Sequence, residues 1–123
     1  MPRKILIIED ETEMAQIIKS RLEKEGFIAT AVENVKDAKN EITSSRPDLI
    51  LSDIILPDGS GLELCKDLKS RDEFKNIPVI MITAVYTEDK DAEVGKKLGA
   101  DAYLYKPYEM KELLDTVKKF ITS

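Results

Sequence analysis

Five aliphatic runs alternate along the chain with five segments whose apolar residues recur at helical spacing. The runs predict strands at residues 4–8, 27–32, 48–53, 77–83 and 102–105. The intervening apolar stripes predict helices at residues 14–22, 35–42, 62–68, 88–98 and 109–121. Strands that alternate with helices form parallel sheets, because each crossover places a helix on one face of the sheet. The 123 residues therefore predict one α/β domain, residues 1–123, with a doubly wound five-stranded parallel sheet and helices on both faces.

Polar residues mark where the predicted helices begin and end. Asn34 is expected to cap the second helix, since its side chain can accept a hydrogen bond from a free backbone N–H. Gly26 is expected to end the first helix, and Thr87 and Gly99 are expected to bound the fourth. The fourth helix has few apolar residues and an internal glycine, Gly95, so we expect it to be weakly anchored.

The third strand delivers an aspartate to the edge of the sheet. Its sequence, Leu-Ile-Leu-Ser-Asp over residues 49–53, is the near-continuous aliphatic run of a buried parallel strand. Ligands of open α/β sheets bind just beyond the carboxyl ends of the strands, which is where Asp53 falls. Asp53 is therefore placed for chemistry, although aspartate is also common where a strand simply turns.

Composition narrows the functions that the chain can have. A net charge of −5 and a pI near 4.9 disfavour direct binding to nucleic acid or to anionic membranes. The first aliphatic run is too short for a signal peptide or a membrane span. The single cysteine, Cys65, lies on the apolar stripe of the third helix and is expected to be a buried thiol in a reducing, cytoplasmic compartment. The absence of histidine excludes histidine-based catalysis by this chain.

Charged and hydroxyl side chains follow four of the five predicted strands. The first strand ends in Glu9 and Asp10, the third in Asp53, the fourth in Thr83 and the fifth in Lys106. In a doubly wound sheet these side chains converge on one crevice. Carboxylates about 5 Å apart repel one another by about 3 kcal/mol per pair at an effective dielectric constant near 20, so a cation is required there.

Lys106 and a divalent metal ion can both supply that positive charge. Carboxylates with a backbone carbonyl suit Mg²⁺, which often shares its coordination with a phosphate, and a site without cysteine or histidine disfavours zinc. An aspartate beside a metal ion, with a hydroxyl and an ammonium nearby, can accept a phosphoryl group. We therefore expect Asp53 to be the nucleophile, with Lys106 and Thr83 contacting the phosphoryl oxygens.

Taken together, these residues resemble the receiver domain of two-component response regulators over essentially the whole chain. The resemblance implies the flavodoxin-like (βα)5 fold with strand order 2-1-3-4-5. The motifs that carry it are Glu9-Asp10, Asp53 with Pro57 and Gly61, Thr83-Ala84, and Gly99-Ala100-Asp101-Ala102-Tyr103-Leu104-Tyr105-Lys106-Pro107.

The resemblance implies a role for each matching residue. Asp53 would be the phosphoacceptor, and Mg²⁺, with Mn²⁺ as an alternative, would be bound by Asp10, Asp53 and the backbone carbonyl of Ile55. Glu9, in place of the aspartate often found first in the acidic pair, would reach the metal ion through water. Thr83 would contact the phosphoryl group.

Three further features follow from the same resemblance. Lys106 would contact the phosphoryl group, and the Lys106–Pro107 peptide bond would be cis. Tyr103 matches the aromatic residue whose rotamer is coupled to the threonine in this family, so Thr83 and Tyr103 would form the switch. Ile55 and Val85 are apolar where polar residues can position the hydrolytic water, so we expect slow self-dephosphorylation.

The implied function is a signalling switch rather than a conventional enzyme, because the domain catalyses only its own phosphorylation and dephosphorylation. The phosphoryl donor would be a sensor histidine kinase or a histidine phosphotransfer protein. The output would be a downstream protein target, if the chain stands alone, or an output domain outside these 123 residues. No contact with nucleic acid or membrane is expected.

Three other functions are compatible with the predicted fold. A constitutive interaction module would lack Asp53, the acidic pair or Lys106, and all are present. A flavodoxin needs a Ser/Thr/Gly-rich phosphate loop after the first strand, where this chain has three acidic residues in a row. A metal-dependent aspartyl-phosphate phosphatase generally needs a second aspartate two residues after the nucleophile, where Ile55 stands.

Overall fold

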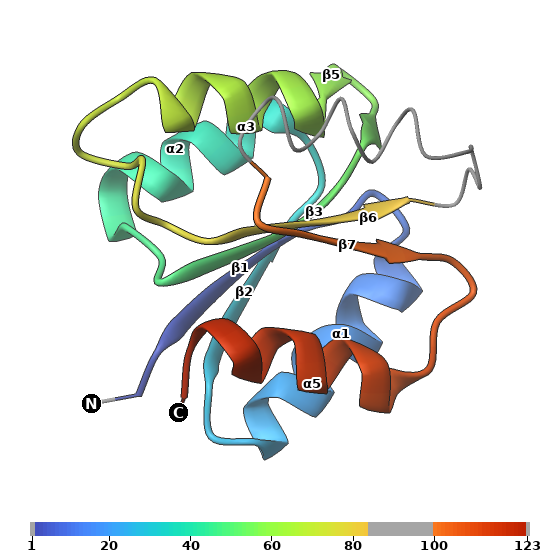
Figure 1. Ribbon diagram of the computed structural model, residues 1–123. Coiled ribbons are helices and arrows are strands. Elements are labelled where there is room, and N and C mark those ends of the chain that lie inside the picture. The colour runs from blue at the N-terminus through green and yellow to red at the C-terminus, as the bar shows by residue number, and fades with distance from the viewer. Residues whose placement is uncertain (1, 84–99, 123) are drawn as a thin grey trace.

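A five-stranded parallel sheet forms the centre of the molecule (Figure 1). The computed structural model describes residues 2–83 and 100–122. The order of the sheet is β2-β1-β3-β6-β7, and since β6 and β7 are its fourth and fifth strands along the chain, the expected order 2-1-3-4-5 is confirmed. The strands are β1 (Lys4–Ile8), β2 (Ile28–Val32), β3 (Leu49–Asp53), β6 (Val79–Thr83) and β7 (Ala102–Tyr105).

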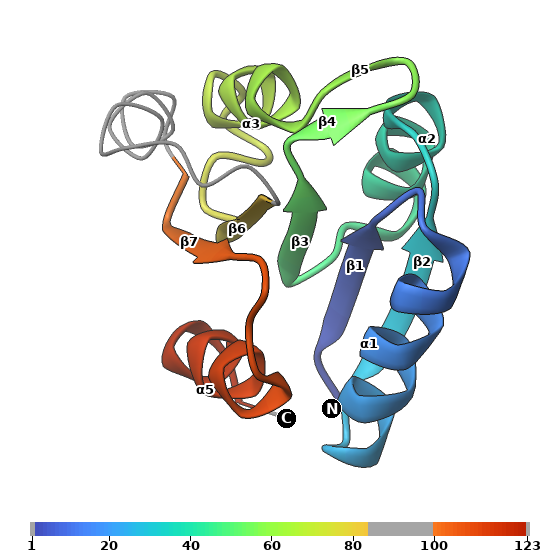
Figure 2. The same cartoon turned by 90° about the vertical axis from the view of Figure 1, so that its right-hand side faces the viewer.

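Two described helices cover each face of the sheet. Helices α1 (Thr12–Lys24) and α5 (Met110–Phe120) lie on one face, and α2 (Val35–Ser45) and α3 (Gly61–Lys69) lie on the other (Figures 1 and 2). The doubly wound α/β architecture is thus as predicted. The expected fourth helix, with its Thr87 cap and Gly99 end, lies outside the described residues. Among the described residues no helix has the length and apolar character needed to cross a bilayer.

Alternate residues of each strand enter two separate cores. On β1, Ile5 and Ile7 pack in the core beneath α1 and α5, whereas Leu6 and Ile8 pack beneath α2 and α3. Burial of one such side chain contributes about 1.5–3 kcal/mol. Since successive side chains of a strand point to opposite faces, a sheet covered on both sides needs continuous aliphatic runs.

Several local predictions are confirmed in detail. The Asn34 side chain accepts a hydrogen bond from the Asp37 backbone N–H at 2.7 Å, as expected of an N-cap. Gly26 follows α1 with a φ of 94°, a conformation that favours glycine. Cys65 is buried, and this burial raises the pKa of its thiol to about 11.

Other details of the prediction are wrong. Strands β2 and β6 start one and two residues later than expected, at Ile28 and Val79. Two very short strands, β4 (Ile55–Leu56) and β5 (Gly59–Ser60), form a hairpin between β3 and α3, where the sequence predicted no strand. Ile17 is one of the apolar residues whose spacing predicts the first helix, yet it is 51% exposed. The face of α1 that packs against the sheet is narrower than the set of apolar residues on this helix. Its buried residues are Ala15, Ile18 and Leu22.

Candidate functional site

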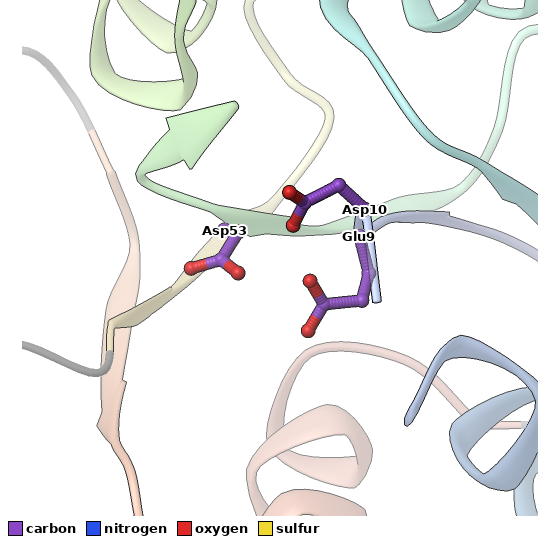
Figure 3. Close-up of side chains that lie close together, drawn as sticks. All are labelled: Glu9, Asp10 and Asp53. Atoms are coloured by element: carbon purple, nitrogen blue, oxygen red, sulfur yellow. The ribbon is translucent and has the colours of Figure 1, made fainter. Parts of the chain in front are cut away.

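Three carboxylates meet at the carboxyl ends of β1 and β3 (Figure 3). Glu9 and Asp10 directly follow β1, and Asp53 is the last residue of β3. The two strands are parallel neighbours with Ile8 paired to Ser52, so the acidic residues emerge side by side. One carboxylate oxygen from each residue lies within 4.8 Å of the others. The sequence therefore correctly predicted that these carboxylates converge.

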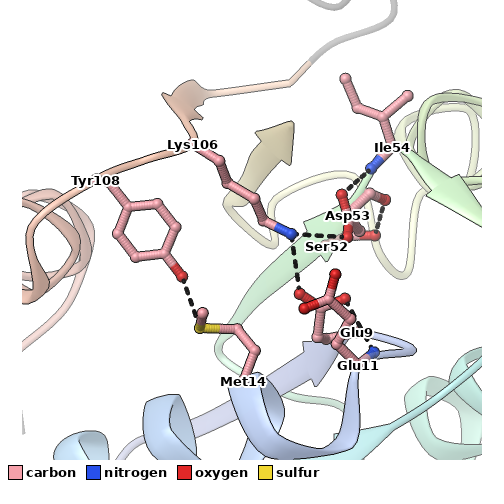
Figure 4. Close-up of polar contacts among 8 residues, drawn as sticks. All are labelled: Glu9, Glu11, Met14, Ser52, Asp53, Ile54, Lys106 and Tyr108. Carbon is pink, nitrogen blue, oxygen red and sulfur yellow. Dashed lines mark hydrogen bonds and ion pairs between the residues drawn. The ribbon is translucent and has the colours of Figure 1, made fainter. Parts of the chain in front are cut away.

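Lys106 supplies a positive charge to this cluster. Its Nζ lies 3.1 Å from Oε1 of Glu9 and 3.2 Å from Oδ2 of Asp53 (Figure 4). The side chains of Glu9, Asp53 and Lys106 are 5%, 13% and 17% exposed, so water screens these interactions only weakly. Burial alone lowers the pKa of Lys106, but the hydrogen bond to Glu9 and the charges of both carboxylates together raise the pKa above its ordinary value.

The backbone brings Thr83 and Lys106 to the same edge. The Lys106 N–H donates to the Thr83 carbonyl at 2.8 Å, which continues the pairing of β6 with β7 one residue past the end of β7. Thr83 is buried at the end of β6. The Lys106–Pro107 bond is cis, as expected. The structure thus brings together all four strand ends that the sequence singled out.

Of the remaining predicted residues, the structure describes Tyr103 and Ile55. Tyr103 pairs with Met81 across β6 and β7, and its ring stacks on that of Tyr105 with centroids 6.3 Å apart. Ile55 begins β4, two residues beyond Asp53, and its side chain points into solvent. Val85 lies outside the described residues.

Three hydrogen bonds at and next to Asp53 were not predicted from the sequence. The buried Ser52 hydroxyl donates to the Asp53 carbonyl at 2.9 Å, where the sequence suggested only a strand residue. The Gly61 N–H donates to the Ile54 carbonyl at 2.7 Å, which fastens the start of α3 to the chain after Asp53. The Ile54 N–H in turn donates to Oδ1 of Asp53 at 3.2 Å. One sign of the Ser52 contact was present in the sequence: Ser52 is a polar residue within an aliphatic run, and a buried hydroxyl requires a hydrogen-bond partner.

The donor set fits a hard divalent cation. All three side chains in the cluster offer carboxylate oxygens, the ligands that Mg²⁺ and Mn²⁺ prefer. Within residues 2–83 and 100–122 this is the group of acidic side chains close enough to share an ion. The arrangement can therefore bind a metal ion beside Asp53, and the Lys106 ammonium contacts Asp53 and Glu9 in the same cluster.

An apolar groove borders the site between α1 and the loop from β7 to α5. It has a volume of about 440 Å³ and is lined by Met14, Ile17, Lys106, Pro107, Tyr108 and Met110. The Tyr108 hydroxyl donates to the Met14 sulfur at 3.7 Å, so the two walls are in contact (Figure 4). Burial raises the pKa of Tyr108. Lys106 lines both the groove and the carboxylate cluster, so the two are continuous.

Comparison with known proteins agrees with this geometry. Residues 5–118 match the family model of the response regulator receiver domain. The chain is 40% identical over 118 residues to the phosphate regulon transcriptional regulatory protein PhoB of Escherichia coli, an alignment that covers 96% of this chain and 51% of PhoB. The chain belongs to the response regulator receiver domain family.

Solved structures of response regulators share the fold. A two-component response regulator from Clostridium difficile superposes with a TM-score of 0.88 at 33% identity, covering 96% of this chain and 94% of that one. The phosphorylated cyanobacterial phytochrome response regulator RcpA superposes with a TM-score of 0.82 at 27% identity, covering 97% and 91%. The chain spans about half the length of the curated relatives that it matches.

Proposed function

We propose that this receiver domain is a phosphorylation-activated switch in which Asp53 accepts a phosphoryl group from a phosphohistidine in a Mg²⁺-dependent reaction. The donor is a sensor histidine kinase or a histidine phosphotransfer protein. The observation that carries the proposal is the position of Asp53. It lies beside the carboxylates of Glu9 and Asp10, which suit a metal ion, and 3.2 Å from the Lys106 ammonium, which also contacts Glu9.

In the proposed reaction a carboxylate oxygen of Asp53 attacks the phosphorus of the donor. The O–P bond forms as the N–P bond to the imidazole breaks, and the electron pair returns to the ring nitrogen. Lys106 offsets the negative charge on the phosphoryl oxygens, and the Thr83 hydroxyl donates a hydrogen bond to one of them.

Mg²⁺ would be held by Asp10, Asp53 and the backbone carbonyl of Ile55, with Glu9 acting through water. When bound, the ion would supply positive charge that offsets the negative charge of the phosphoryl oxygens. Glu9 has a second role, because its carboxylate also accepts a hydrogen bond from Lys106. This pair keeps the lysine side chain at the site before phosphorylation.

Phosphorylation would be read out through Thr83 and Tyr103. The modification adds about two negative charges and three strong acceptors beside Lys106. Thr83 moves toward them, and Tyr103 turns into the space that the threonine leaves. A shift from 1:99 to 99:1 between two states requires about 5.5 kcal/mol, which a few charge-assisted hydrogen bonds can supply. The altered face then binds a downstream protein or an output domain of the same protein.

The apolar groove beside Lys106 is the proposed docking surface for the donor protein. A phosphohistidine can reach Asp53 only if the donor covers the surface around the site, and this groove is continuous with it through Lys106. The Ile17 side chain is exposed in this groove, and nothing in the fold requires an apolar residue in contact with solvent at this position.

The proposal is tested by intact mass after incubation with acetyl phosphate. We expect a gain of one phosphoryl group that requires Mg²⁺ and is lost in Asp53→Ala, while Asp48→Ala is phosphorylated normally. If acetyl phosphate fails, a phosphorylated histidine kinase is the second donor. A folded protein that gains no mass from either donor, or that gains it in Asp53→Ala, contradicts the proposal.

A further inference from the structure

The carboxylate of Asp58 reaches from the turn after Asp53 to the first turn of α2. Its Oδ1 accepts from the Val35 N–H at 2.7 Å, and its Oδ2 accepts from the Lys36 N–H at 3.0 Å. The first N–H groups of a helix have no partner within the helix and favour negative charge. The Asn34 side chain accepts from the Asp37 N–H, so Asn34 and Asp58 together cap the first turn of α2. Asp58 does so although it lies 23 residues from Val35 and 22 residues from Lys36 in the sequence.

Asp58 is also one of the two turn residues of the β4–β5 hairpin, with Pro57. In this hairpin Ile55 pairs with Ser60 and Leu56 pairs with Gly59. Strands of two residues are marginal by themselves, so the hairpin needs outside contacts. A Cβ atom on Gly59 would lie 3.3 Å from Cγ2 of Val35, so the turn packs closely on the start of α2.

The hairpin begins at the residue whose carbonyl the proposed metal site uses. The Ile55 side chain is 68% exposed and does not anchor this position. The anchors are instead the hairpin pairing and, one residue earlier, the hydrogen bond from the Gly61 N–H to the Ile54 carbonyl. The far end of the hairpin is held by the two hydrogen bonds of Asp58.

Helix α2 offers a firm attachment for that far end. Its residues Ala38 and Ile42 are fully buried in the same core as Leu6 and Ile8 of β1. Strand β1 ends at Glu9 and Asp10. The contacts through Asp58 and α2 therefore connect the loop after β3 with the strand that carries the acidic pair.

We infer that Asp58 is a positioning residue of the metal site: by clamping the β4–β5 hairpin to α2, it fixes the Ile55 carbonyl relative to the acidic pair. The inference rests on the proposed function, because it concerns the same Mg²⁺ site. Asp58 itself contacts no metal ion in this scheme.

The test compares four variants of the full chain. Asp58→Ala removes both acceptors, and Asp58→Asn removes the charge and one of the two acceptors. Asp58→Glu keeps the charge and both acceptors but displaces the carboxylate by one methylene. Asp72→Asn removes a fully exposed carboxylate elsewhere and is the control for net charge. Mg²⁺ affinity is measured by calorimetry, and amide hydrogen exchange of residues 35, 36, 55, 56 and 58–60 is measured by NMR without metal ion.

We expect Asp58→Ala and Asp58→Glu to bind Mg²⁺ about 10-fold more weakly, as is typical when support around a metal ligand is lost. Their hairpin amides should also exchange faster, while the amides of β1 and β3 stay protected. Asp72→Asn should match the wild type in both measurements.

Three results overturn the inference. Wild-type affinity in Asp58→Ala shows that the clamp does not position the site. Wild-type affinity in Asp58→Glu, with weaker binding in Asp58→Asn, shows that only charge matters. No Mg²⁺ binding by the wild type removes the proposed function as well, and this failure is distinct because it is seen before any substitution is made.

Discussion

A Cβ atom on Gly61 would lie 2.1 Å from the backbone carbonyl oxygen of Asp53, far inside van der Waals contact. It would also lie 2.8 Å from Oγ of Ser52. The first residue of α3 thus packs directly on the backbone that presents the proposed phosphoacceptor. Only glycine permits this approach, so any larger residue must displace the helix or Asp53.

We expect Gly61→Ala to lower the free energy of unfolding by at least about 2 kcal/mol, since the clash is with backbone that cannot rotate away. Gly59→Ala is the matched control, because its new Cβ would meet only a side-chain methyl of Val35 at 3.3 Å. Urea denaturation measures both. Equal stability of the two variants would contradict the close packing of Gly61 on Asp53.

Replacement of Lys106 by methionine leaves Glu9 and Asp53 without their cation. Carboxylates about 5 Å apart repel by about 3 kcal/mol at an effective dielectric constant near 20, so Lys106→Met should lose about 1–3 kcal/mol of stability without metal ion. Mg²⁺ should then raise its melting temperature more than that of the wild type. Lys66→Met, on the exposed face of α3, controls for loss of charge. A smaller Mg²⁺ effect in Lys106→Met would refute this prediction.

Burial of the Cys65 thiol should lower the free energy of unfolding at alkaline pH. Its pKa is raised from 9.0 to about 11 by burial, so the folded state holds the proton more tightly than the unfolded state. This contribution is complete below pH 9.0 and declines as the pH rises toward about 11, by up to about 1.4 kcal/mol per pH unit.

Cys65→Ala should be less stable than the wild type at neutral pH. Its free energy of unfolding should fall less steeply between pH 9.0 and about 11. The raised pKa of Lys106 gives a separate loss only as the pH rises above 10.5, which the variant should retain. Urea titrations at successive pH values provide the measurement. Parallel profiles for the two proteins would show that Cys65 does not cause the decline.

Substitution of Ile17 should weaken docking of the donor protein without affecting phosphoryl transfer to Asp53. Because Ile17 is 51% exposed, Ile17→Ser should leave stability nearly unchanged. It should slow phosphorylation by a histidine kinase by about 10-fold or more, as for a central interface residue, and leave phosphorylation by acetyl phosphate unaffected. Ile28→Ser, at a site 49% exposed on β2, is the control. Equal rates with the kinase in both variants would remove the groove as the docking surface.

The lifetime of the phosphorylated protein depends in our proposal on Ile55. An apolar side chain beside the acyl phosphate does not orient the hydrolytic water, and its 68% exposure means that substitution should not disturb the fold. Ile55→Asn should therefore shorten the lifetime, measured as the decay of the phosphorylated mass. A lifetime that is unchanged or longer would refute the idea.

The amino-acid sequence by itself determined the architecture and the composition of the site. Aliphatic runs and helical stripes are local patterns, and their alternation permits few topologies. Because parallel strands end at one edge, the sequence also predicted that Glu9, Asp10, Asp53, Thr83 and Lys106 meet there. The family resemblance added the strand order.

The tertiary structure decided the contacts that depend on how loops cross the molecule. Periodicity indicated that Ile17 is apolar on a helix, but not that it lies beyond the edge of the core. An aspartate in a turn gave no sign that Asp58 would cap a helix 22 residues earlier in the chain. Likewise, Glu9 pairs with Lys106 across 97 positions. Such hydrogen bonds are set by distances between segments, which only the packed fold defines.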